Sequence, residues 1–107
     1  MGGKKVLLAA AIASAVPIAH SKAQDIGQPS HGLQLARQLC AQCHAIEKQQ
    51  ARSPNDNAPR FQVVASVPGM TAIALSAALN TSHRSMPNIM LSADEQADII
   101  AYILSLK

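Results

Sequence analysis

Aromatic residues are nearly missing from this sequence. Phe61 and Tyr102 are the only ones, and tryptophan is absent. An apolar core alone barely stabilises a domain of this size, and here Ala, Leu, Ile and Val would have to fill that core. Such a core is thin, so we expect a large apolar group other than a side chain to complete it. Each square ångström of apolar surface that this group buries would contribute roughly 25 cal/mol.

A basic surface is missing as well. Lys4, Lys5 and Lys22 account for the whole formal net charge of +3. They lie in an N-terminal stretch that we expect to be removed, and the acidic and basic residues of positions 24–107 balance one another. Nucleic-acid binding needs a basic patch. We therefore expect no nucleic-acid partner.

No apolar run reaches membrane-spanning length. The N-terminal run covers residues 6–18, whereas a spanning helix needs roughly 20 apolar residues. Two lysines precede it and the small residues Ser21 and Ala23 follow it, which is the pattern of a Sec-type signal peptide. We predict a signal peptide over residues 1–23 and one periplasmic domain over 24–107, without stable membrane insertion. Cleavage after Ser21 is an alternative, and an uncleaved anchor is the competing interpretation.

Helical periodicity is visible in three segments and no strand pair is visible, so the predicted fold class is all-α. The expected helices cover about residues 31–45, residues 71–79, and residue 93 to the C-terminus. Ser92 and Glu95 match a capping box at the start of the last helix. The stretch from residue 49 to 59, with two prolines, is expected to be a loop. Residues 61–67 fit either a short helical turn or an extended piece.

Cysteine is scarce, and both cysteines lie in one motif. Cys40-Ala41-Gln42-Cys43-His44 is a C-x-x-C-H match, the signature of covalent haem attachment. Two thiols three positions apart on a tight turn can each add to one vinyl group of the haem. The next residue then places its imidazole under the iron. The motif therefore predicts one haem c bonded to Cys40 and Cys43, with His44 as an iron ligand, and this haem is the group that completes the thin core.

Two other roles for the cysteine pair are disfavoured. A redox disulfide of the thioredoxin kind lies at a strand-to-helix junction, and the sequence shows no strands. A structural zinc site needs four ligands, and the sequence contains no second cysteine pair.

The second iron ligand is expected from the loop between the second and third predicted helices. Met86 fits best, because Pro87 restrains the backbone beside the sulfur. A soft thioether favours ferrous iron and raises the reduction potential. Met90 and His83 are alternatives, as is an open or water-bound position, whereas Met70 is interpreted as core filler.

Other residues are expected to support the haem. Pro59 is the candidate whose carbonyl accepts the second ring N–H of His44, since such bonds orient iron ligands; an ordinary loop proline is the alternative. Arg60 and Arg84 are candidates to pair with the haem propionates, although surface arginines are usually only solvated.

These segments together resemble the small monohaem class I cytochromes c of bacteria, over nearly the whole of residues 24–107. The resemblance rests on Cys40-Ala41-Gln42-Cys43-His44, Ala58-Pro59-Arg60-Phe61, His83-Arg84-Ser85-Met86-Pro87 and Asp98-Ile99-Ile100-Ala101-Tyr102-Ile103. It implies the cytochrome c fold, with three main helices wrapped around one covalently bound haem. In that family a glycine of the first helix meets an aromatic residue of the last where the two cross, and Gly32 and Tyr102 occupy these positions.

The resemblance also implies a function. Such a protein would carry one electron between redox protein partners by outer-sphere transfer, with both iron ligands in place, and would be a carrier rather than an enzyme. Partners would dock at the exposed haem edge, and the chain would be a monomer or a subunit of a larger complex. Two alternatives stay open: a haem c subunit of a periplasmic oxidoreductase, and a gas-binding haem sensor in which Met86 leaves the iron.

Overall fold

The computed structural model describes residues 1–3, 10–12, 14–15, 17, 27–81, 83 and 85–107. Much of the expected signal peptide, its cleavage site and Arg84 lie outside these ranges, so those predictions stay predictions. No helix in the described part of the chain has the length and apolar character needed to cross a membrane.

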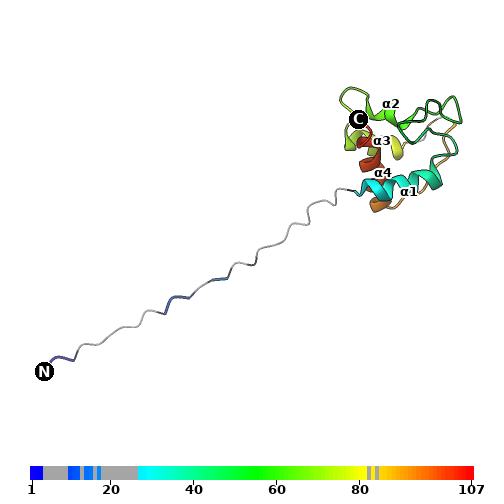
Figure 1. The fold of residues 1–107 in the computed structure, drawn as a ribbon. Helices are drawn as coiled ribbons and strands as arrows, with labels where there is room; N and C mark the ends of the chain where they lie inside the picture. Colours follow the sequence, from blue (N-terminus) through cyan, green and yellow to red (C-terminus); the bar gives the residue numbers. More distant parts are fainter. Residues whose placement is uncertain (4–9, 13, 16, 18–26, 82, 84) are drawn as a thin grey trace.

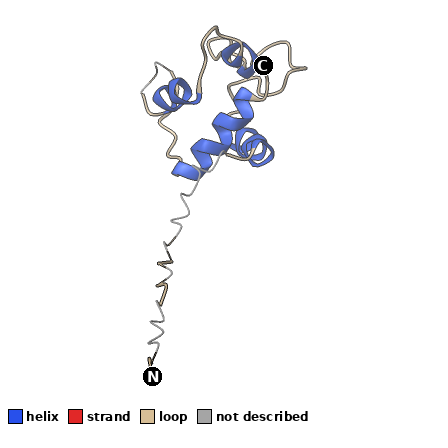
Figure 2. Ribbon diagram, turned by 90° about the vertical axis from the view of Figure 1, so that its left-hand side faces the viewer, coloured by secondary structure: helices blue, strands red, loops and turns tan. Residues whose placement is uncertain are grey.

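The described residues form four helices and no strand, which confirms the all-α fold (Figures 1 and 2). These are α1 (Pro29–Leu39), α2 (Phe61–Ala65), α3 (Ala72–Leu79) and α4 (Ala93–Leu104). Three of them are the expected main helices, and α2 shows that the short helical turn was the right alternative for that segment. The expected loop between α1 and α2 is irregular throughout.

The first helix ends earlier than the expected position near Ala45. Its regular bonding stops where the amide of Ala41, like that of Cys40, donates to the carbonyl of Ala36, both at 2.9 Å. The amide of His44 then bonds to the carbonyl of Cys40 at 2.9 Å, so the haem motif makes a separate turn. The predicted boundary was wrong because the apolar spacing continues into the motif turn, whereas the regular helical hydrogen bonds end before it.

Helices α1 and α4 pack across one another, as Figures 1 and 2 show. A Cβ atom added at Gly32 would collide with the carbonyl of Asp98 and lie 2.8 Å from Cβ of Tyr102. The expected contact between Gly32 and Tyr102 is therefore confirmed, and glycine allows it because it has no side chain.

Replacing Gly32 with alanine should force these two helices apart. Overpacking of this kind typically lowers the free energy of unfolding by about 1–3 kcal/mol. Denaturant unfolding followed by circular dichroism would measure it. Gln38→Ala, at an exposed site on the same helix, is the matched control. Equal stability of the two variants would mean that the crossing is not tight.

Helix α4 contributes one side of the core. Its residues Ile99, Ile100, Tyr102 and Ile103 are buried, and so is Leu106 just beyond its end. Ile99 is the only large side chain in the described residues that is less than 2 % exposed, so the polypeptide's own core is indeed thin. Ile73 of α3, in contrast, is 83 % exposed.

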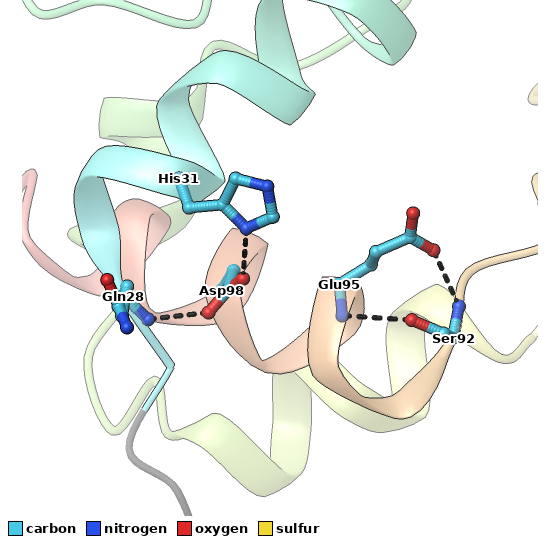
Figure 3. Close-up of polar contacts among 5 residues, drawn as sticks. All are labelled: Gln28, His31, Ser92, Glu95 and Asp98. Carbon is cyan, nitrogen blue, oxygen red and sulfur yellow. Dashed lines mark hydrogen bonds and ion pairs between the residues drawn. The ribbon is translucent and has the colours of Figure 1, made fainter.

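Side chains at and near the start of α4 cap the beginnings of both α4 and α1 (Figure 3). At the start of α4, Ser92 Oγ accepts from the Glu95 amide at 3.2 Å and Glu95 Oε2 accepts from the Ser92 amide at 2.8 Å, which confirms the capping box. Asp98 then caps the neighbouring helix. Its Oδ1 accepts the backbone N–H of Gln28 at 2.6 Å, and its Oδ2 lies 2.5 Å from Nδ1 of His31. A carboxylate from α4 thus satisfies a free amide at the start of α1.

This cap should make stability depend on pH in the acid range. The hydrogen bond from His31, and then that from the Gln28 amide, hold the pKa of Asp98 below its ordinary value of 3.8. The stabilisation is therefore complete above that value and is lost as the pH falls through the lowered pKa of the folded state.

Asp98→Asn should remove this loss of stability at acid pH. It should also lower the free energy of unfolding at pH 7 by on the order of 1 kcal/mol. Denaturant titrations between neutral and strongly acid pH would measure both effects. Asp94→Asn, which removes an exposed carboxylate from the same helix, is the control. An equal loss in both variants would contradict the capping role.

Candidate functional site

A cavity of about 390 Å³ opens beside the motif turn. Cys40, Cys43, His44 and Met86 all line it, although Met86 is far from the motif in sequence. Most of the remaining lining is apolar and includes Leu39, Phe61, Val64, Leu75, Leu79, Ile99 and Ile103. A volume of this size and an apolar wall with a few polar groups are typical of a cofactor site.

The motif turn presents both cysteines to the cavity. The Cys43 amide donates to the Cys40 carbonyl at 3.1 Å, which keeps the turn tight. Both thiols are free and half-buried. Burial raises the pKa of the Cys40 thiol to about 11, so in the folded polypeptide this thiol is protonated at neutral pH.

The segment after the motif is anchored to the core. Ala45 and Ile46 are buried, and Tyr102 of α4 donates its hydroxyl to the Ile46 carbonyl at 2.7 Å. Burial, followed by the nearby charge of Glu47, raises the pKa of Tyr102, so the hydroxyl keeps the proton that it donates. The turn that carries His44 is therefore held against α4.

The imidazole of His44 has a fixed partner on one side. Its Nδ1 lies 2.7 Å from the carbonyl oxygen of Pro59. A carbonyl only accepts, so Nδ1 carries a proton, and in the neutral imidazole Nε2 is then the nitrogen with the free lone pair. The ring of Phe61 packs beside it, with ring centroids 5.3 Å apart. This arrangement suits a histidine that binds a metal through Nε2.

The methionines differ in their placement. Met86 is half-buried and lines the cavity, whereas Met90 is 89 % exposed and is not part of the lining. Met70 packs partly against the core. His83 lines the cavity too. Of the alternatives from the sequence, the structure therefore brings Met86 and His83 to the site and turns Met90 away.

The polar groups at the wall differ from those expected. Arg60 does not line the cavity; its guanidinium donates to the Gln50 carbonyl at 3.3 Å. Asn55 and Asn57 line the cavity instead. Asn55 Oδ1 accepts the Asn57 amide at 3.0 Å, which leaves the Asn55 NH₂ group to donate. Both asparagines lie in the predicted loop of residues 49–59, and their place beside Pro59 in the sequence is the one signal for their role.

The fold and the cysteine–histidine turn define a c-type haem protein. The sequence profile of the Cytochrome c family matches residues 30–107, and the chain belongs to this family. The chain is similar to cytochrome c-552 of Bradyrhizobium diazoefficiens, with 40% identity over 77 residues that cover 72% of this chain and 73% of that protein. A search of solved structures found no significant match.

Family membership establishes the general function. The chain is an electron carrier with covalently attached haem c, not an enzyme, and it exchanges electrons with redox partners. The cavity fits this cofactor, because its wall combines two free thiols, an imidazole with an available nitrogen, a thioether and a broad apolar surface.

Proposed function

We propose that this chain carries single electrons between redox protein partners in the periplasm, with the haem iron held between His44 and Met86. One observation carries the proposal. The thiols of the motif, an imidazole already oriented by Pro59 and the thioether of Met86 line the same cavity. The Cys40 and Cys43 sulfurs would form the thioether bonds.

The chain's residues have separate tasks in this proposal. The Pro59 carbonyl accepts a hydrogen bond from Nδ1–H of His44 and so keeps Nε2 available to the metal. The thioether of Met86 stabilises the reduced form of the metal and raises its reduction potential. Haem c supplies the ferric/ferrous couple. With His44 and Met86 both bound in each oxidation state, little reorganisation would accompany each electron.

The apolar wall has its own role. Leu75 and Ile99 are buried beside the cavity, and Phe61 shields His44. Such side chains exclude water, and the hydrophobic shell around a metal site controls its redox potential. We further propose that the carboxamides of Asn55 and Asn57, rather than Arg60, meet the haem propionates.

The test is a redox titration of the exported holoprotein with absorption spectroscopy. We expect one reversible one-electron transition, a pyridine haemochrome spectrum of covalently bound haem, and no CO adduct at neutral pH. Rapid binding of CO would favour the gas sensor instead. Co-elution of the native protein with a larger enzyme would favour the subunit. Periplasmic fractionation and N-terminal sequencing, with Gln24 as the expected first residue, test the export.

A further inference from the structure

The loop that carries Met86 is held at its two ends by one side chain. The loop leaves α3 at Asn80 and enters α4 at Ser92. Gln96 lies one turn into α4, where its amide bonds to the Ser92 carbonyl at 2.9 Å. The capping box of Ser92 and Glu95 closes this end of the loop (Figure 3), and the helical bond connects Gln96 to it.

The Gln96 side chain reaches from there to the other end of the loop. Its Nε2 donates to Ser76 Oγ at 2.6 Å, and its Oε1 accepts from Asn80 Nδ2 at 3.1 Å. Asn80 Nδ2 also donates to the Ser76 carbonyl at 2.8 Å, so the three side chains form one network. Ser76 and Gln96 are half-buried, which protects their bond from water.

Apolar packing holds α3 along one side only. Leu75 is its one buried residue, Leu79 at its end packs partly against the core, and Ile73 near its start is 83 % exposed. The Gln96 bridge adds hydrogen bonds to this packing at the end of α3 where the loop begins.

The loop itself needs to be held. Ser85, directly before Met86, has φ of 70°, a conformation that is uncommon for residues other than glycine. Strained residues persist only where their surroundings hold them, and they cluster at functional sites. A loop with such a residue would relax if its ends were free to move.

We propose that Gln96 is a positioning residue for Met86: by bridging the two ends of the loop, it keeps the thioether in the haem cavity. The inference rests on the proposed function, in which Met86 binds the iron. It adds that the lifetime of the iron–sulfur bond is set by a side chain that does not touch the haem site.

The test measures how fast imidazole binds to the ferric holoprotein, because imidazole reaches the iron only after Met86 leaves. Gln96→Leu keeps the size and helix propensity of the side chain but removes both hydrogen bonds. Each bond contributes about 1 kcal/mol, so we expect binding to become about tenfold faster or more. Gln96→Glu retains two acceptor oxygens for Ser76 and Asn80 and should restore slow binding. Gln34→Leu, at an exposed site on α1, is the matched control.

The unfolding midpoint of Gln96→Leu, compared with that of Gln34→Leu, shows how much of the change in imidazole binding reflects general stability. A positioning role predicts faster imidazole binding in Gln96→Leu, with the sulfur-to-iron absorption band still present at rest. Ser76→Ala, which removes the bond to Nε2 only, should give a smaller increase and replaces Gln96→Leu if that variant does not fold. Rates equal to those of Gln34→Leu in both variants would overturn the inference while Met86 ligation stood. Equal rates in Met86→Ala and the parent would instead overturn the ligation itself.

Discussion

Cys40→Ala and Cys43→Ala are each expected to leave at most one thioether bond and to reduce the yield of holoprotein severely. The reason is the thin core: the cavity of about 390 Å³ is lined by Leu39, Val64 and Leu79, which the polypeptide alone leaves exposed or only partly buried, so the haem is needed to cover them. Burying each aliphatic side chain of this kind contributes roughly 1.5–3 kcal/mol. Since small domains are stable by only about 5–15 kcal/mol in total, losing the haem removes much of that margin.

Mass spectrometry and the pyridine haemochrome spectrum would measure this effect in protein exported by a host that ligates haem. The mass shows whether haem is attached, and the haemochrome maximum reports how many vinyl groups have reacted. Gln42→Ala, an exposed residue between the two cysteines, controls for changes in the turn itself. A haem-free polypeptide with the full helical content and cooperative unfolding of the parent would contradict the role of the haem as interior.

Met86→Ala is expected to abolish the weak far-red band of sulfur-to-ferric-iron charge transfer and to lower the reduction potential. The thioether favours ferrous iron, and for a one-electron couple each tenfold loss of that preference is 59 mV. We expect a fall of about 60 mV or more. The vacated position should also bind CO, imidazole or cyanide readily, because the cavity wall at Met86 would then be open.

Met90→Ala is the matched control. Its side chain is 89 % exposed and lies outside the cavity lining, so the far-red band and the potential should be those of the parent. The opposite pattern, with the band lost in Met90→Ala and kept in Met86→Ala, would reassign the ligand. Absence of the band from the parent protein itself would point to His83, which also lines the cavity.

Local patterns predicted those elements whose structure depends on neighbouring residues in sequence. The capping box at Ser92 forms as expected because both of its bonds join residues three positions apart. The buried face of α4 follows from helical periodicity alone. The predicted end of α1 was wrong because periodicity alone does not report hydrogen bonding. The apolar spacing extends into the motif turn, whereas the backbone bonds at Ala36 end the regular helix at Leu39.

The sequence alone determined the chemistry of this protein. A C-x-x-C-H turn, scarce aromatic residues and a capped apolar last helix are local features, and together they predict a small helical c-type haem carrier. Tertiary structure decided which residues distant in sequence line the cavity beside the motif turn. It placed Met86 in the cavity and Met90 outside it, replaced Arg60 with two asparagines at the wall, and joined the ends of the Met86 loop through Gln96. These contacts join residues from separate elements, so they depend on how the helices pack and not on the spacing of residues along the chain.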